Sequence, residues 1–384
     1  MIRVLGKGNT AKAIKENFKD VILYDEDDFS LYENSSEELT VVSPGIPPHN
    51  FMVKQSKNIV SDYDLLVDKM PLSIWISGTN GKTTTTQMCQ HILENKNSQY
   101  GGNIGTAVSN MDINKSIWIL ETSSFTFHYT KYAKPNIYLL LPISEDHLSW
   151  HGSFYEYEKA KLKPFSMMNE EDIIVAPNKY KDIKTDACLI TYENSDDLCL
   201  QFGIEKEKIK FKEPFLLDAI LSLISKKILF DSIDYNKINT YVVDKHKVEE
   251  FKDKKNRLWI DDSKATNIDA TMNALKPYEN IYIHLILGGD DKGVNIEPLF
   301  KYLKNLKVTI YAIGSNEDKI EKYCKQYDLN IIKCKYLKTS VLKIHKNLKE
   351  KELAILSPGA ASLDQFNSYM HRGEEFKKFV YSLS

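Results

Sequence analysis

The first 69 residues alternate between apolar and mixed stretches in a pattern that predicts a small βαβ sheet. The predicted strands are IRVLG, DVILYDED and LTVVSPGIPP, the last ended by Pro and Gly. Between the first two, the stretch TAKAIKENF predicts a helix. We therefore assign residues 1–69 to a first, Rossmann-like domain.

Residues 70–243 predict a second domain, built around a parallel sheet. Its first strand and helix lie in LSIWISGTNGKTTTTQMCQHIL, on either side of a glycine loop. Further strands are predicted at SIWILET, NIYLLLPIS and DIIVAP, and helices at FYEYEKAKLKPF and over residues 214–230. These strands end in polar residues, at the edge where such sheets hold ligands.

Residues 244–384 alternate again and predict a doubly wound C-terminal domain. The strands are RLWIDD, IYIHLILGG, VTIYAIG and ELAIL, and helices are predicted at DATMNAL, before Tyr327 and at the C-terminus. The predicted fold class is therefore α/β with three domains, Rossmann-like at both ends and a P-loop ATPase core with a parallel sheet in the middle.

Composition places the chain among ordinary globular proteins. It has 384 residues, too many for one core, with 42% hydrophobic and 27% charged residues. No apolar run approaches the ~18 residues that span a bilayer. The chain opens directly on a strand, MIRVLGKGNT, without the pattern of a leader peptide, so we expect a cytoplasmic protein.

Charge and cysteine usage exclude several classes of site. A net charge of -2 gives no basic surface for nucleic acid and favours small-molecule partners. The cysteines are scattered and never form C-x-x-C, which argues against both a disulfide framework and a zinc site. We expect buried thiols at Cys89, Cys188, Cys199, Cys324 and Cys334.

A glycine turn after the first strand is the first candidate for chemistry. Gly6 and Gly8 form G-x-G, and Asp25 ends the next strand, where such folds meet ribose hydroxyls. Ala11 stands where the third glycine of a dinucleotide site would be. The pattern fits a nucleotide-sugar site and a structural tight turn equally well.

The glycine loop of the central domain has the residues that bind phosphate. Its backbone N–H groups and the following helix N-terminus can converge on phosphate oxygens. Lys82 would neutralise the terminal phosphates and Thr83 would offer its hydroxyl to Mg²⁺. The usual spacing would put glycine at Ile76. The loop residues are Gly78, Thr79, Asn80, Gly81, Lys82 and Thr83.

Three further polar residues of this domain are candidates for chemistry, two at strand ends and one on a helix. Glu121 ends a strand and fits a metal ligand, or else a solvated surface acid. His147, beside Asp146, follows the next strand and is either functional or structural. Spacing alone makes Lys161, on the following helix, a solvated lysine.

Two polar glycine turns follow strands of the C-terminal domain. One runs from Gly288 to Lys292 and the other from Ser357 to Ser362. Similar turns at neighbouring strand ends favour a site for an anionic substrate over simple connections.

The motifs between Gly78 and Gly373 together resemble those of the Mur ligases of peptidoglycan synthesis, in particular the branch that adds D-glutamate. In this family the phosphate loop is GTNGKT and Ile76 still belongs to the strand, which accounts for the spacing. The first domain matches only loosely. The motifs are, in order, GTNGKTT, GGNIG, ETSSF, DHLSWHGS, AKLK, DDSKATN, GGDDKG and SPGAASLDQF followed by RG.

This resemblance implies a monomeric, Mg²⁺-dependent enzyme that uses ATP to join D-glutamate to UDP-N-acetylmuramoyl-L-alanine through an acyl phosphate. It implies that residues 1–69 bind the UDP-substrate, 70–243 form the ATPase and 244–384 bind D-glutamate and ATP. The alternatives are another Mur-type or folylpolyglutamate-type ligase, and an ATP-dependent binding protein without amide chemistry.

The resemblance also implies roles for individual residues. The catalytic residues would be Lys82, Glu121, His147 and Lys161, the last carbamylated near a second Mg²⁺. The metal ligands would be Thr83, Glu121, His147 and Lys161. ATP contacts are implied for Gly78, Thr79, Asn80, Gly81, Lys82, Thr83, Thr84, Lys247 and Asp262. Substrate contacts are implied for Thr10, Asp25, Ser43, Asn103, Lys264, Thr266, Lys292, Ser362 and Tyr369.

The chain departs from the family pattern at several of its motifs. Trp150 and Lys247 stand where arginine is usual, and Tyr369 where phenylalanine is. The element that contacts adenine in the family reads PFLLDA here, with Asp218 in place of asparagine.

Overall fold

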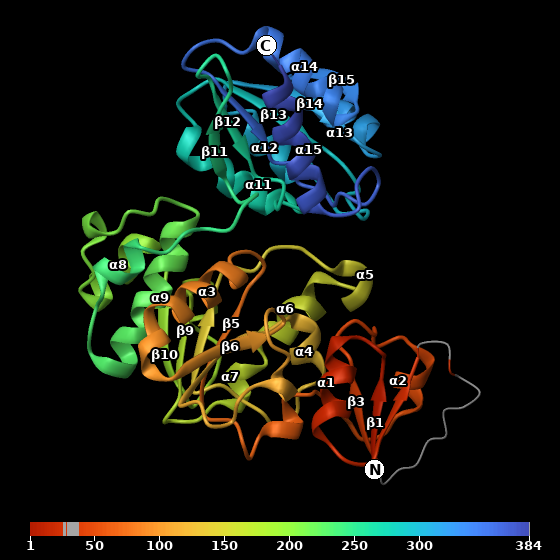
Figure 1. Cartoon of the computed structure of the whole chain (residues 1–384), viewed down its shortest axis with the longest axis vertical. Helices are drawn as coiled ribbons and strands as arrows, with labels where there is room; N and C mark the ends of the chain where they lie inside the picture. Colours follow the sequence, from red (N-terminus) through yellow and green to blue (C-terminus); the bar gives the residue numbers. More distant parts are fainter. Residues whose placement is uncertain (26–27, 29–37, 384) are drawn as a thin grey trace. The chain divides into compact units, whose positions relative to one another are not determined.

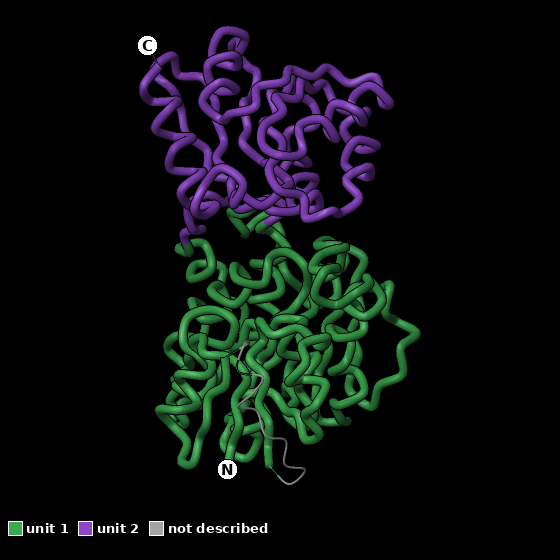
Figure 2. The backbone as a smooth tube through the Cα atoms, turned by 90° about the vertical axis from the view of Figure 1, so that its right-hand side faces the viewer, with its two compact units in different colours: residues 1–211, 215–241 green, residues 212–214, 242–384 purple. Residues whose placement is uncertain are grey.

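The computed structural model describes residues 1–25, 28 and 38–383, whose strands form three sheets (Figure 1). Helices connect most of the strands, which confirms the predicted α/β fold class. The chain divides into two compact units, Met1–Phe211 with Phe215–Tyr241 and Lys212–Pro214 with Val242–Ser384 (Figure 2). The domain boundaries after residues 69 and 243 stay predictions.

The first sheet has four parallel strands in the order β2-β1-β3-β4. The sequence predicts three of these strands and α1, but not β4 or α2, which are too short to show a period. Because all the strands run the same way, their carboxyl ends meet at one edge of the sheet. The elements are β1 (Ile2–Leu5), α1 (Asn9–Asn17), β2 (Val21–Tyr24), β3 (Leu39–Val42), α2 (Phe51–Gln55), β4 (Ile59–Val60) and η1 (Asp64–Leu66).

The central sheet has six parallel strands in the order β10-β9-β8-β5-β7-β6. All four predicted strands are present, and β6 and β10 join them at the edges. The elements are β5 (Leu72–Ser77), α3 (Lys82–Leu93), η2 (Glu94–Lys96), β6 (Ser98–Gly102), η3 (Val108–Asn110), β7 (Ile117–Glu121), α4 (Ser124–Tyr129), β8 (Ile137–Leu140), α5 (Leu148–His151), α6 (Phe154–Leu162), α7 (Pro164–Met167), β9 (Ile173–Pro177), η4 (Asn178–Tyr180), β10 (Cys188–Tyr192), α8 (Ser195–Phe202), η5 (Lys206–Lys208), α9 (Phe215–Phe230) and α10 (Tyr235–Asn239).

Large aromatic side chains form the core beside the central sheet. Trp75 of β5, Trp118 of β7 and Tyr138 of β8 are fully buried and share one cluster with Phe127 of α4 and Phe165 of α7. Each ring of this size buries on the order of 150–250 Å². Helix α3 packs against β5, β7 and α9 (Figure 1), so the strand and helix on either side of the glycine loop are both held in place.

The third sheet has the order β11-β12-β16-β13-β14-β15, with β11 antiparallel to β12 and the other pairs parallel. The edge strands β11 and β15 were not predicted, because their Lys and Glu residues interrupt any apolar run. The elements are β11 (Glu249–Lys252), β12 (Leu258–Asp261), α11 (Ile268–Leu275), η6 (Lys276–Tyr278), β13 (Ile283–Leu287), α12 (Glu297–Leu303), β14 (Val308–Ile313), α13 (Glu317–Tyr327), β15 (Asn330–Lys335), α14 (Leu337–Asn347), β16 (Leu353–Leu356) and α15 (Tyr369–Ser382).

Burial of the cysteines agrees with the expectation except at one position. Cys89, Cys199, Cys324 and Cys334 are buried, whereas Cys188 is exposed. The expectation is wrong there because Cys188 begins β10, an edge strand of the central sheet. Among the described residues, no helix combines the length and the apolar character that crossing a membrane requires.

The first and central sheets are joined by a buried carboxylate, that of Asp64 in η1. Its Oδ2 accepts hydrogen bonds from the backbone N–H groups of Ser61 and Lys131, at 2.9 Å each. Its Oδ1 accepts from those of Tyr132 and Ala133, at 2.8 Å each. One side chain therefore satisfies backbone donors of the segment after β4 and of the segment that leads from α4 to β8.

We expect Asp64→Ala to lower the free energy of unfolding by roughly 3 kcal/mol, because it leaves several buried backbone donors without an acceptor. The measurement is urea unfolding followed by tryptophan fluorescence. Asp68→Ala, at an exposed position in the same segment, is the matched control and should unfold as the wild type does. Identical midpoints for both variants would contradict the role given to Asp64.

Candidate active site

The phosphate-type loop lies between β5 and α3, as predicted. β5 runs through Ile76 to Ser77, which confirms that Ile76 belongs to the strand. Gly78 has φ +140° and a Cβ there would lie 2.5 Å from the Cβ of Leu141. Gly81 has φ +84°, and a Cβ there would lie 2.5 Å from Oδ1 of Asp218. Both positions therefore require glycine, and the loop presents the N-terminus of a twelve-residue helix to any bound anion.

Lys82 folds back over this loop. Its Nζ donates to the carbonyl oxygens of Gly78 at 3.0 Å and Thr79 at 2.8 Å. Burial lowers the pKa of Lys82, and the carboxylates of Glu121 and Asp146 act in the opposite direction. A desolvated cation therefore lies beside the loop, where phosphate charge would stabilise it.

Glu121, at the end of β7, is hydrogen-bonded to two other predicted site residues. It is only 2% exposed. Its Oε2 accepts from the hydroxyl of Thr83 at 2.8 Å and its Oε1 from the side-chain amide of Asn103 at 2.7 Å. Carboxylate and hydroxyl oxygens are the ligands that Mg²⁺ prefers, so the donor set fits the implied metal.

Lys161 of α6 is buried, so its interpretation from spacing as a solvated lysine is wrong. It is 1% exposed, and its Nζ donates to the carbonyl of Gly78 at 2.8 Å and the hydroxyl of Ser77 at 3.2 Å. Burial, and then the positive charge of Lys82, hold the pKa of Lys161 well below its usual value. Packing of α6 decides this burial, and spacing along the helix does not reveal it.

His147 lies at the start of α5, with φ +53°. Its Nε2 is 3.7 Å from Oδ2 of Asp146, and the ring of Phe125 packs edge-on against it at a centroid distance of 4.7 Å. The side chain of His147 is 41% exposed. Its role as a metal ligand stays a prediction.

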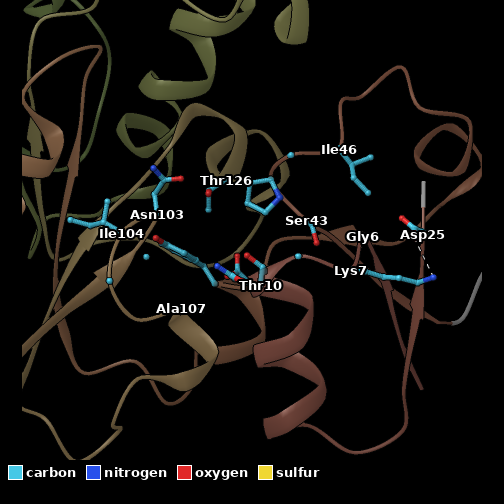
Figure 3. Close-up of a pocket in the computed structure, with 18 residues that line it drawn as sticks. Gly6, Lys7, Thr10, Asp25, Ser43, Ile46, Asn103, Ile104, Ala107 and Thr126 are labelled. Carbon is cyan, nitrogen blue, oxygen red and sulfur yellow. Dashed lines mark ion pairs between the residues drawn. The ribbon is translucent and has the colours of Figure 1, made fainter. Parts of the chain in front are cut away.

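A cavity of about 640 Å³ lies at the carboxyl edge of the first sheet (Figure 3). The four predicted substrate residues of this unit, Thr10, Asp25, Ser43 and Asn103, all line it. In Figure 3, Asn103 lies at one end, Asp25 and Lys7 lie at the other, and Thr10 and Ser43 lie between. Asn103 also donates to Glu121, whose other carboxylate oxygen accepts from Thr83, so a lining residue of this cavity is connected to the phosphate-type loop through Glu121.

Sequence reasoning missed two residues that line this cavity, Asp62 and Tyr63. They follow β4, a two-residue strand that no periodicity could show. The signal available in the sequence was the short apolar pair before SDYD.

In the second compact unit the two predicted glycine turns lie side by side, because β13 and β16 are neighbouring parallel strands. The N–H of Gly288 donates to the carbonyl of Pro358 at 2.9 Å, and Asp290 and Ala361 exchange backbone hydrogen bonds of 3.0 and 2.8 Å. On these turns Lys292 is exposed and Ser362 is 4% exposed.

Other predicted residues of this unit gather around the loop after β12. The ammonium of Lys264 lies 4.1 Å from the ring centroid of Tyr369, a cation–π contact between two predicted substrate residues. Thr266 lies in the same loop, partly buried.

The two predicted ATP residues of this unit lie on neighbouring segments. Asp262 accepts from the hydroxyl of Ser357 at 2.7 Å and from the N–H of Val248 at 3.2 Å. Burial raises the pKa of Asp262 to about 7. Lys247 donates to Asp244 at 3.0 Å.

Arg372 of α15 belongs to the RG pair of the family motifs, but the sequence analysis gave it no role. It is 1% exposed, and its guanidinium donates to the carbonyl and hydroxyl oxygens of Ser263 at 2.8 and 3.0 Å and to the carbonyl of Ala360 at 3.1 Å. Arg372 thus fixes the Lys264 loop and the turn before Ser362 relative to each other.

Comparison with known proteins decides the family. A sequence profile of the Mur ligase middle domain matches residues 76–249. The UDP-N-acetylmuramoylalanine–D-glutamate ligase of Campylobacter jejuni is 47% identical over 398 residues, covering 99% of each chain. The chain belongs to the Mur ligase family. The ligase of the same name from Helicobacter pylori is 41% identical over 417 residues, also covering 99% of each chain.

Solved structures share the Mur ligase fold at low sequence identity. The MurF ligase from Thermotoga maritima in complex with ADP is 15% identical, with a TM-score of 0.61 and coverage of 89% of this chain and 88% of that one. Folylpolyglutamate synthase from Mycobacterium tuberculosis is 12% identical, with a TM-score of 0.57 and coverage of 82% and 93%. These likenesses bear on the fold alone.

We expect Gly81→Ala to weaken the binding of Mg-ADP at least ~10-fold, because the new Cβ would displace the first turn of α3 or Asp218. The measurement is isothermal titration calorimetry. Gly152→Ala is the matched control, since Gly152 has φ +82° but no atom within 4 Å of the added Cβ. Equal affinity in both variants would show that the loop does not hold the phosphates.

Proposed function

We propose that this member of the Mur ligase family is the ATP-dependent amide ligase that adds D-glutamate to UDP-N-acetylmuramoyl-L-alanine in peptidoglycan precursor synthesis. The hydrogen bond from Asn103 to Glu121 carries the proposal, because it connects a cavity large enough for a nucleotide-sugar to a phosphate-type loop. The Campylobacter and Helicobacter ligases of that name are 47% and 41% identical to this chain over 99% of its length, which supports the choice of substrates.

The reaction needs ATP because a carboxylate has no leaving group that an amine could displace. Transfer of the γ-phosphoryl group breaks its bond to the β-phosphate oxygen, releases ADP and converts the L-alanyl carboxylate into an acyl phosphate. The amine of D-glutamate attacks the acyl carbon to form a tetrahedral intermediate. Collapse of this intermediate expels inorganic phosphate, and loss of a proton to water leaves the amide.

In the first unit, we assign phosphate binding to the loop from Gly78 to Thr84, with Lys82 against the β- and γ-phosphates. Thr83, Glu121, His147 and carbamylated Lys161 would hold Mg²⁺, which when bound neutralises phosphate charge. The fixed positions of Lys82 and of the loop amides favour charge that develops during transfer, since they need no reorganisation. Thr10, Asp25, Ser43 and Asn103 would hold the UDP-substrate.

In the second unit, the side chains have the chemistry that D-glutamate requires. We assign its two carboxylates to the cations of Lys264 and Lys292 and to the hydroxyls of Thr266 and Ser362, because charge-assisted hydrogen bonds are the strong ones. Tyr369 would pack on the amino acid. Lys247 and Asp262 would contact ATP.

We also place the protein in the cytoplasm, where ATP and nucleotide-linked sugars are available, and expect a monomer. Light scattering of the purified protein tests the oligomeric state. A mass of two chains would contradict the monomer and leave the chemistry untouched.

Acceptor-dependent phosphate release tests the function. With ATP, Mg²⁺ and UDP-N-acetylmuramoyl-L-alanine, we expect release with D-glutamate and none with L-lysine, diaminopimelate or a folate acceptor. ¹⁸O placed in the alanyl carboxylate should appear in the phosphate, as an acyl phosphate requires. Lys82→Ala, expected to lose at least ~10² in turnover, controls for contaminating ATPases.

Each alternative predicts a different result of this assay. Turnover with another acceptor would identify a different ligase of the superfamily. ATP binding without acceptor-stimulated turnover would identify a binding protein.

Carbamylation of Lys161 can be tested without an activity assay. Because burial holds the pKa of Lys161 well below its usual value, more of the uncharged amine that reacts with CO₂ is present than at an exposed lysine. We expect ¹³C-bicarbonate to give a carbamate NMR signal in the wild type and none in Lys161→Arg. The matched control is Lys163→Arg, whose lysine also has a pKa lowered by burial but donates to the carbonyls of Phe127 and His128. A signal that survives in Lys161→Arg would remove the modification from this residue.

A further inference from the structure

The cavity beside the first sheet contains a buried acid to which neither the family resemblance nor the proposed function assigns a role. Asp62 is 5% exposed and lines the cavity with the substrate residues named above. Gly6, Asp25 and Ser43 directly follow β1, β2 and β3, and Asp62 follows β4 after one residue. Every strand of the sheet therefore contributes to the cavity at its carboxyl end, the edge where such sheets bind ligands.

Asp62 belongs to the end of the cavity near Glu121. The hydroxyl of its neighbour Tyr63 donates to the carbonyl of Glu121 at 3.3 Å. The backbone N–H of Asn103 donates to the same carbonyl at 2.8 Å. Tyr63 and Asn103 are thus held by one residue of β7. β4, which precedes Asp62, and β2, which precedes Asp25, are the opposite edges of the first sheet, so Asp62 and Asp25 belong to opposite ends of the cavity. In Figure 3, Asn103 likewise lies at the end away from Lys7 and Asp25.

The order of chemical groups along the proposed substrate determines which of them lies at the Asn103 end of the cavity. The diphosphate suits the N-terminus of α1, where Gly8 and Thr10 line the cavity and the first turn has no acidic residue. Asp25 at the end of β2 suits the ribose. The alanyl carboxylate must reach the phosphate-type loop, so the muramoyl-alanyl arm extends toward Asn103 and Asp62.

The charge around Asp62 favours a ligand that donates a hydrogen bond. Among the described residues, its carboxyl group accepts from the backbone N–H groups of Asp62 and Tyr63, faces the negative charge of Asp64 and has no ion-pair partner. Burial, with a smaller contribution from Asp64, raises the pKa of Asp62 to about 7. Such a group repels phosphate and is stabilised by an N–H donor.

We propose that Asp62 is a specificity-determining residue of this cavity, which accepts a hydrogen bond from the amide N–H that links L-alanine to the muramoyl lactyl group. The proposal rests on the proposed function, since it takes UDP-N-acetylmuramoyl-L-alanine as the ligand. UDP alone lacks this arm and does not contact Asp62.

Calorimetric titration of the full chain with UDP-N-acetylmuramoyl-L-alanine and with UDP tests the proposal. Asp62→Ala should weaken binding of the full substrate roughly 10- to 100-fold, as loss of a hydrogen bond to a charged acceptor does, and leave UDP binding within about 2-fold. Asp62→Asn keeps one acceptor oxygen and should lie between. Asp68→Ala, the exposed control in the same segment, should bind both ligands as the wild type does.

Two further readouts separate recognition from a structural role. In turnover, the Asp62 variants should raise KM for the UDP-substrate while KM for ATP and D-glutamate stay unchanged; a rise in all of them would indicate a structural residue. If the Asp62 variants do not fold, the wild-type protein can still test the proposal. A substrate analogue with an ester in place of the alanyl amide should bind to it at least ~10-fold more weakly than the substrate does. Equal affinity for amide and ester would overturn the proposal. A wild type that binds no UDP-substrate would instead refute the proposed function.

Discussion

The buried carboxylate of Glu121, at the end of β7 in the central sheet, connects the two parts of the first unit's candidate site, the phosphate-type loop and the cavity. Parallel pairing sets Glu121 level with Ile76 of β5 and Gly102 of β6, so one residue lies beside both the phosphate-type loop and the Asn103 turn. Its two oxygens then take one hydrogen bond from each side, from Thr83 and from Asn103. Because sheet register is fixed by the buried faces of the strands, the position of Glu121 between these two segments is fixed by the packing of the core.

The buried lysines make sense only in relation to an anion. Lys82 and Lys161 both donate to the carbonyl of Gly78. Burial lowers the pKa of each lysine, and the positive charge of Lys82 lowers the pKa of Lys161 further. Backbone carbonyls satisfy their hydrogen bonds but do not neutralise their charge. A polyanion such as the phosphate chain of ATP relieves this penalty, and so does conversion of Lys161 to a carbamate. Burial of these two cations, which is unfavourable in the free protein, is therefore compensated when an anion binds beside them.

The sequence predicted those parts of the fold and of the candidate site that depend only on residues close together in the chain. The glycine loop, the strand-end position of Glu121 and the paired glycine turns of the second unit follow from short-range patterns, and the structure has them where predicted. Burial of Lys161 depends on how α6 packs. Asp62 and Arg372 depend on a two-residue strand and on contacts between distant segments. Contacts between distant segments produce no periodic pattern of residues from which they could be predicted.

Two departures from the family pattern are explained by packing. Trp150, where arginine is usual, packs on the apolar cluster of Leu5, Val42, Ile46 and Tyr129 that joins the first sheet to the central one. An arginine would introduce charge into that cluster. Asp218, in the element expected to contact adenine, is 3% exposed and accepts from the hydroxyl of Thr85 at 2.8 Å. Its Oδ1 would also lie 2.5 Å from a Cβ on Gly81, so Asp218 packs against the first turn of α3 and the adjoining glycine of the phosphate-type loop.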